Sequence, residues 1–127
     1  MEEIVLVRDV GIDNVEHAVM QSKVTFVDCW APWCKPCLKL SSILEELEVK
    51  YSDNPDVGFL KIDVHQYQEY GTRNNIYAIP CVLVFFDGEP AQFEDPSSKQ
   101  SGNMTDRLVG VRPFEQYESV IEQLLGT

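Results

Sequence analysis

The sequence predicts an α/β protein in which a central mixed sheet of about five strands has helices on both faces. Short apolar, β-branched runs alternate along the chain with segments whose apolar residues recur at helical spacing. Strands that alternate with helices in this way are joined by parallel crossovers. Asp87-Gly88 directly follows an apolar run and predicts a hairpin turn, which adds antiparallel pairing to the sheet.

The expected elements follow from these patterns in order. The strands are expected at Ile4 to Val7, Val24 to Cys29, Val57 to Asp63, Pro80 to Phe86 and Arg107 to Val111. The helices are expected from Asp13 or Asn14 to about Met20, from Cys34 to about Tyr51, from Gln66 to Arg73, and from Pro113 to Leu125.

A chain of 127 residues holds one core and is too short for two ordinary domains, so residues 1–127 are expected to form a single domain. Residues 89–105 are rich in Pro, Ser, Gln and Asn and far exceed a hairpin loop of ~2–5 residues. We therefore expect an inserted loop there. Only Phe93 and Met104 could anchor it, which predicts that most of it is mobile.

The net charge of −11 disfavours nucleic-acid binding, which uses clustered Lys and Arg to neutralise phosphates. No apolar run approaches the ~20 residues that would cross a membrane. The chain also starts without a basic segment followed by an apolar one, which indicates the cytoplasm. We expect a cytoplasmic monomer, in a compartment where cysteines are kept reduced.

Cys34 and Cys37 are separated by two residues, at the point where a strand-like run gives way to a helical one. A thiol at a helix N-terminus is acidified by free backbone N–H groups and by the helix dipole. The pair is thus interpreted as a redox dithiol. The alternative is half of a zinc site, but Cys29, Cys81, His17 and His65 are the only other nitrogen or sulfur candidates and lie at irregular spacing, so no metal is expected.

The stretch Val27-Asp28-Cys29-Trp30-Ala31-Pro32-Trp33-Cys34-Lys35-Pro36-Cys37 resembles the active-site strand and turn of the thioredoxin family. Ile79-Pro80, Asp87-Gly88-Glu89 and Gly110 resemble the family's cis-proline, hairpin turn and last-strand glycine. The resemblance implies the thioredoxin fold, the reduction of protein disulfides without a cofactor, and a thioredoxin reductase as electron donor.

In the expected mechanism, Cys34 attacks a substrate disulfide and Cys37 resolves the mixed disulfide, which leaves Cys34 and Cys37 oxidised as the redox-active disulfide. Asp28 is the expected base for Cys37, because burial should raise its carboxyl pKa towards neutrality. The alternative is that Asp28 faces solvent. The residues expected to contact substrate are Trp33, Lys35, Pro36, Ile79 and Pro80, and those expected to support the site are Trp30 and Gly110.

Two departures from the family pattern bear on this chemistry. Counting back from Ile62-Asp63, Phe59 stands where many relatives have a Lys near the buried Asp, so Asp28 is expected to lack a charge partner. Lys35 replaces the usual Gly, and its charge should favour the Cys34 thiolate and a less reducing couple. Cys29 and Cys81 are interpreted as buried core thiols, although Cys81 could approach the active site.

Three function classes remain open at this point. The first, which the sequence favours, is a general reductase of protein disulfides. The second is a redox protein with a dedicated partner that docks through residues 89–105. The third is a non-enzymatic interaction module that keeps the fold, which the intact pair of Cys34 and Cys37 disfavours because a pure binder needs no resolving thiol.

Overall fold

A computed structural model describes residues 8–98 and 102–126. The main sheet contains the strands β1 (Arg8–Asp9), β2 (Val24–Trp30), β3 (Val57–Asp63), β4 (Cys81–Phe86), β5 (Glu89–Pro90) and β8 (Arg107–Val109). The helices are α1 (Val15–Val19), α2 (Lys35–Lys50), α3 (Gln68–Arg73) and α4 (Phe114–Leu125). A separate two-stranded sheet pairs β6 (Phe93–Glu94) with β7 (Met104–Thr105).

The main sheet is mixed, as the sequence predicts. Its order is β1-β3-β2-β4-β5, with β8 also paired to β4. β1 and β2 run parallel to β3, whereas β4 runs antiparallel to β2, β5 and β8. The strand expected at Ile4 to Val7 lies outside the described residues.

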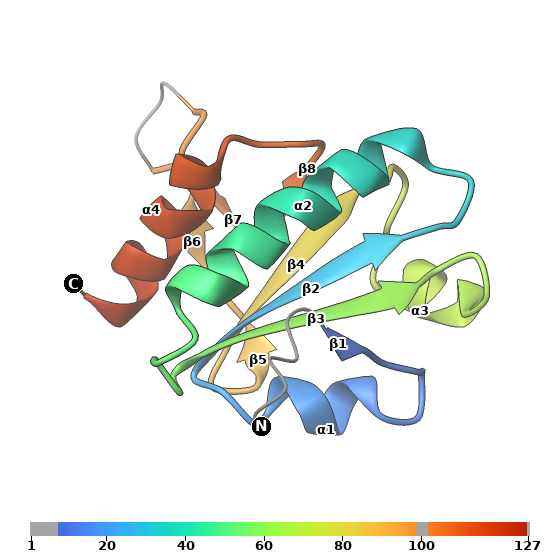
Figure 1. Ribbon diagram of the computed structural model, residues 1–127, viewed down its shortest axis with the longest axis horizontal. Helices are drawn as coiled ribbons and strands as arrows, with labels where there is room; N and C mark the ends of the chain where they lie inside the picture. The colour runs from blue at the N-terminus through green and yellow to red at the C-terminus, as the bar shows by residue number, and fades with distance from the viewer. Residues whose placement is uncertain (1–7, 99–101, 127) are drawn as a thin grey trace.

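β2 occupies the centre of the sheet, and six of its seven residues are buried. Two apolar clusters lie on the two sides of this sheet. The first contains the apolar faces of α2 and α4, and the second contains those of α1 and α3. Figure 1 shows α2 lying across the strands with α4 beside it, while α1 and α3 lie apart from them. The helices therefore cover both faces, as expected.

The turn after β4 follows from its sequence. Asp87 and Gly88 both have positive φ angles, 53° and 84°, which a two-residue hairpin of this kind requires. Phe86 pairs with Glu89 and Phe85 with Pro90, so β5 returns antiparallel to β4 for two residues. The expected hairpin is confirmed.

Of the two anchors expected for residues 89–105, the structure confirms Phe93 and contradicts Met104, and it adds contacts that the sequence did not suggest. Phe93 is 1% exposed and belongs to the core cluster that includes α4, and Ala91 is also buried. β6 and β7 pair with each other, and Glu94 exchanges two hydrogen bonds of 2.9 Å between its backbone and the Gln123 side chain of α4. Met104, the other expected anchor, is 54% exposed. Figure 1 shows these strands beside α4.

Candidate functional site

Cys34 and Cys37 lie at the junction between β2 and α2: Cys34 directly precedes the helix and Cys37 lies in its first turn. Cys34 is the N-cap of α2 with an extended backbone, and Pro36 lies in the first turn, where its fixed φ suits a helix start. The Cys37 backbone N–H donates to Cys34 Sγ over 3.3 Å. The two residues form a disulfide with their Cα atoms 5.3 Å apart. The sequence-predicted dithiol is therefore assembled at a helix N-terminus.

Both cysteines are buried in this disulfide form. Cys34 is 5% exposed and Cys37 is 2% exposed, so both are shielded from solvent in the oxidised state. They cluster with Ala31, and the partly buried side chains of Trp30 and Ile79 pack against them. Trp30 thus lies against the dithiol. The neighbouring Trp33 is 66% exposed and forms the outer surface of the site.

Asp28 lies on β2, two residues before the end of the strand, and is 1% exposed. Its Oδ1 atom has no hydrogen-bond partner among the described residues. Burial raises the pKa of this carboxyl to about 7, because the ionised form loses its hydration. The alternative in which Asp28 faces solvent is wrong.

Asp28 does have a charge partner, contrary to expectation. In the parallel register of β2 and β3, Asp28 lies opposite Lys61, whereas Phe59 lies opposite Phe26. Register partners share one face of a sheet, so the Lys61 ammonium acts on the carboxyl and partly offsets the effect of burial on its pKa. Counting along the sequence missed Lys61 because the pairing of the strands, and not the distance from Asp63, decides which side chain faces Asp28.

Lys61 also lies over the Trp30 ring, with its Nζ atom 4.9 Å from the ring centroid. This position is favourable for a cation because the face of the indole ring carries negative charge. Lys61 therefore interacts both with the buried Asp28 carboxyl and with Trp30, which packs against the dithiol.

The rim of the site comes from the loops before β4 and after β8. The Ile79-Pro80 bond is cis, as expected, and the Gly110 N–H donates to the Pro80 carbonyl over 2.9 Å. Gly110 has a φ of +84°, which explains a glycine here. This hydrogen bond joins the turn after β8 to the loop that carries Pro80.

The structure adds one rim residue that the sequence did not suggest. His65, named from the sequence only as a possible nitrogen ligand for a metal, accepts a hydrogen bond at Nδ1 from Trp33 Nε1 over 3.4 Å, and the two rings meet edge to face. No spacing pattern links residues 33 and 65. The contact arises because β3 ends beside the turn that carries Trp33.

Cys29 and Cys81 are register partners on β2 and β4, and neither is disulfide-bonded. They belong to the cluster under α1 and α3, which is the opposite side of the sheet from α2. Burial raises the pKa of both thiols, which keeps them protonated and unreactive. Their interpretation as core thiols is confirmed.

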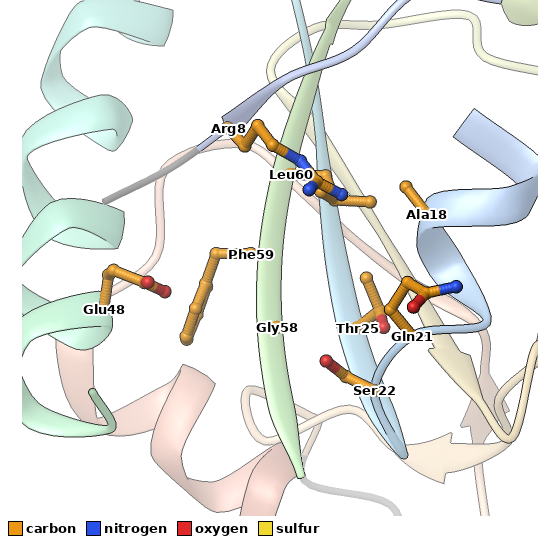
Figure 2. Close-up of a pocket in the computed structure, with 9 residues that line it drawn as sticks. All are labelled: Arg8, Ala18, Gln21, Ser22, Thr25, Glu48, Gly58, Phe59 and Leu60. Carbon is orange, nitrogen blue, oxygen red and sulfur yellow. The ribbon is translucent and has the colours of Figure 1, made fainter. Parts of the chain in front are cut away.

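A surface hollow shown in Figure 2 lies beside Gly58 to Leu60 of β3. Glu48 and Phe59 lie on one side of the strand, and Gln21 and Ser22 lie on the other. None of its lining residues belongs to the dithiol site. A second hollow is lined by Trp33, Val64, Tyr77 and Ile79 among others, and Ile79 also packs against the dithiol.

Within residues 8–98 and 102–126, no three His, Cys, Asp or Glu side chains gather as metal ligands would. The helices of the same residues include none that is long and apolar enough to cross a membrane.

Comparison with known proteins gives a consistent result. A family model described as Thioredoxin matches residues 7–111. Thioredoxin from Staphylococcus saprophyticus is 35% identical over 106 residues, which cover 84% of this chain and 86% of that protein. Thioredoxin from Staphylococcus aureus is 32% identical over 122 residues, which cover 96% of this chain and 98% of that protein.

Solved structures are similar in fold at lower identity. Chloroplastic thioredoxin z has a TM-score of 0.75 at 22% identity, with 99% of this chain and 100% of that chain covered. A mutant thioredoxin from Halobacterium salinarum has a TM-score of 0.73 at 22% identity, with 98% of this chain and 95% of that chain covered.

Proposed function

The chain belongs to the thioredoxin family, and we propose on that premise that Cys34 and Cys37 play distinct, sequential parts in its reaction. The protein is a thiol-disulfide oxidoreductase that acts on disulfide substrates and is reduced in turn by a thioredoxin reductase. The observation that carries the proposal is the Cys34–Cys37 disulfide at the N-terminus of α2.

Cys34 makes the first attack. As the N-cap, its sulfur lies where the helix presents unpaired backbone donors, and the Cys37 N–H already points at it. These donors favour a thiolate over a thiol. The thiolate attacks one sulfur of the substrate disulfide, the substrate S–S bond breaks, and the released substrate sulfur takes up a proton. A mixed disulfide between Cys34 and the substrate results.

Cys37 makes the second attack. Its thiol passes a proton to the Asp28 carboxylate, and the resulting thiolate attacks the Cys34 sulfur. The bond between Cys34 and the substrate breaks, and the second substrate sulfur leaves as a thiolate that takes up a proton. The raised pKa of Asp28, about 7, supports this step because a base whose pKa lies near neutral pH is neither permanently protonated nor too weak. The products are the reduced substrate and the Cys34–Cys37 disulfide.

Substrate contacts are assigned to the exposed surface around the dithiol. Trp33 offers a large apolar contact, and Lys35 and Pro36 are exposed in the first turn of α2. Ile79 packs against the disulfide and precedes Pro80, so its backbone is available to pair with an extended substrate chain.

The same proposal covers the setting in which the protein works. Residues 1–127 form one domain that acts as a cytoplasmic monomer, without nucleic acid or a membrane as partner. The unlinked thiols of Cys29 and Cys81 support a reducing compartment, and the net charge of −11 disfavours a phosphate-binding surface.

The test uses a Cys37→Ser variant, which can form the mixed disulfide but cannot resolve it. We expect this variant to retain disulfide-linked substrate proteins through Cys34, as mass spectrometry of the linked peptides would show. A Cys34→Ser variant is the matched control and should retain none. Linkage through Cys37 in the control would reverse the two roles.

The number of captured proteins decides between two forms of the proposal. Many captured proteins fit a general reductase, whereas repeated capture of a single protein would indicate a dedicated partner. A wild-type protein that reduces no disulfide at all would leave only the interaction module.

A further inference from the structure

Asp95, which follows β6, is attached to the end of β8 through a half-buried ion pair. Arg112, which follows β8, donates from Nη1 and Nη2 to the two carboxylate oxygens of Asp95 over 2.9 and 3.3 Å. The side chains are 16% and 24% exposed. The pKa of Asp95 falls to about 2, chiefly because Arg112 donates to its carboxylate. A two-pronged guanidinium–carboxylate pair fixes orientation as well as distance.

The same guanidinium holds the turn that leads from β8 to α4. Its Nε donates to the Val109 carbonyl over 3.0 Å, and its Nη1 donates to Gln116 of α4 over 3.0 Å. Arg112 therefore has hydrogen bonds to three parts of the chain: Asp95, the backbone at Val109, and Gln116 near the start of α4.

Two further contacts link the turn at Val109 and Gly110 to the dithiol. Gly110, the residue after Val109, donates its N–H to the carbonyl of Pro80. Pro80 follows Ile79, which packs against Cys34 and Cys37. An unbroken chain of contacts thus runs from Asp95 to the backbone edge assigned to substrate.

We propose that Arg112 is a positioning residue for protein substrates, which uses its ion pair with Asp95 to hold the Val109–Gly110 turn against the cis-proline loop. The inference rests on the proposed function and concerns binding only. Val109 is 45% exposed beside this edge, where it would meet a protein chain lying along Ile79. A small disulfide reaches the sulfur atoms without needing that turn, so its reduction should not depend on Arg112.

A structural role alone predicts something different. If Arg112 merely stabilised the fold, its loss would lower the melting temperature and would affect small and large disulfides alike. Positioning predicts a higher KM for a protein disulfide with kcat unchanged, since the turn contributes to binding and not to sulfur exchange.

The experiment measures reduction of insulin, a protein disulfide, and of a small aromatic disulfide, at a temperature where every variant is folded. Asp95→Asn keeps the shape of the carboxylate and removes its charge. We expect it to raise the KM for insulin by ~2- to 5-fold, the factor that corresponds to an ion pair of this exposure. Its kcat and its rate on the small disulfide should match the wild type.

The reciprocal exchange, Asp95→Arg with Arg112→Asp, should restore the insulin KM in part. Lys50→Gln is the matched control, because Lys50 pairs with Glu118 and joins α2 to α4 without touching the turn. An unchanged KM in Asp95→Asn, or the same rise in Lys50→Gln, would overturn the inference. A wild-type protein inactive on both disulfides would instead overturn the proposed function.

Discussion

Asp28 lies inside the core on β2, and its carboxyl has Lys61 opposite it on β3. These two side chains determine when the site can accept a proton. Burial raises the carboxyl pKa and Lys61 lowers it, and burial has the larger effect, so the pKa settles at about 7. Asp9, on β1, adds a small effect in the same direction as burial.

The raised pKa makes Asp28 a cost to stability at neutral pH. Below pH ~4 the carboxyl is protonated in both the folded and the unfolded chain, and there is no cost. Between pH ~4 and about 7 only the unfolded chain ionises, so the cost grows, and above that range it stays constant at roughly 4 kcal/mol. Asp28→Asn should therefore gain stability over wild type progressively through this window while slowing disulfide reduction. Urea unfolding from pH 4 to 9 measures the difference, and a difference independent of pH would contradict burial of the ionisable carboxyl.

The charge of Lys61 should set the pH range in which the rate of disulfide reduction rises. Lys61→Met removes the charge that favours ionised Asp28, so the Asp28 pKa should rise further. The acid limb of the profile of disulfide reduction against pH should then move to higher pH. Lys39→Met, which removes an exposed charge from α2, is the control and should leave the limb in place. Equal movement in both variants would assign the shift to net charge.

At the scale of elements, the sequence predicts those helices, strands and turns that depend on residues close together in the chain. The dithiol turn, the Asp87-Gly88 hairpin and the apolar face of α2 each depend on a few neighbouring residues, and all appear as expected. Lys61 was missed because strand register is a property of two strands that are far apart in sequence.

The β6–β7 sheet was missed for a related reason. Composition alone indicates a polar loop, yet one buried aromatic, Phe93, is sufficient to fix it when α4 supplies the matching surface. The apolar content of a segment does not tell how much of it will be buried against an element later in the chain.

This packing gives a direct test. Phe93→Ala should destabilise the fold by ~3–5 kcal/mol, because it empties a fully buried aromatic site. Met104→Ala, on the neighbouring strand, should change stability by less than ~0.5 kcal/mol, since Met104 is 54% exposed. Denaturant unfolding measures both changes. Similar small losses in the two variants would show that residues 91–105 do not belong to the folding unit.

At the scale of the whole molecule, one sheet separates two cores with different tasks. The core under α2 and α4 lies on the same face of β2 as Asp28, and α2 begins at the dithiol, whereas the core under α1 and α3 holds the paired Cys29 and Cys81. The reactive and the unreactive sulfurs are thus kept on opposite sides of the central strands. Sequence alternation along β2 predicts this division, because Asp28 and Cys29 are adjacent and must point to opposite faces.

Chemical labelling of the two buried thiols should report when the core of the protein opens. In the oxidised form Cys34 and Cys37 are blocked, so an added thiol reagent can react only at Cys29 and Cys81, which are 0% and 1% exposed. Because they lie side by side on β2 and β4 in the core under α1 and α3, both should become accessible only when that core opens. Labelling should therefore proceed to two equivalents per chain, with a urea dependence equal to that of global unfolding. A weaker dependence on urea would reveal a local opening of the core under α1 and α3.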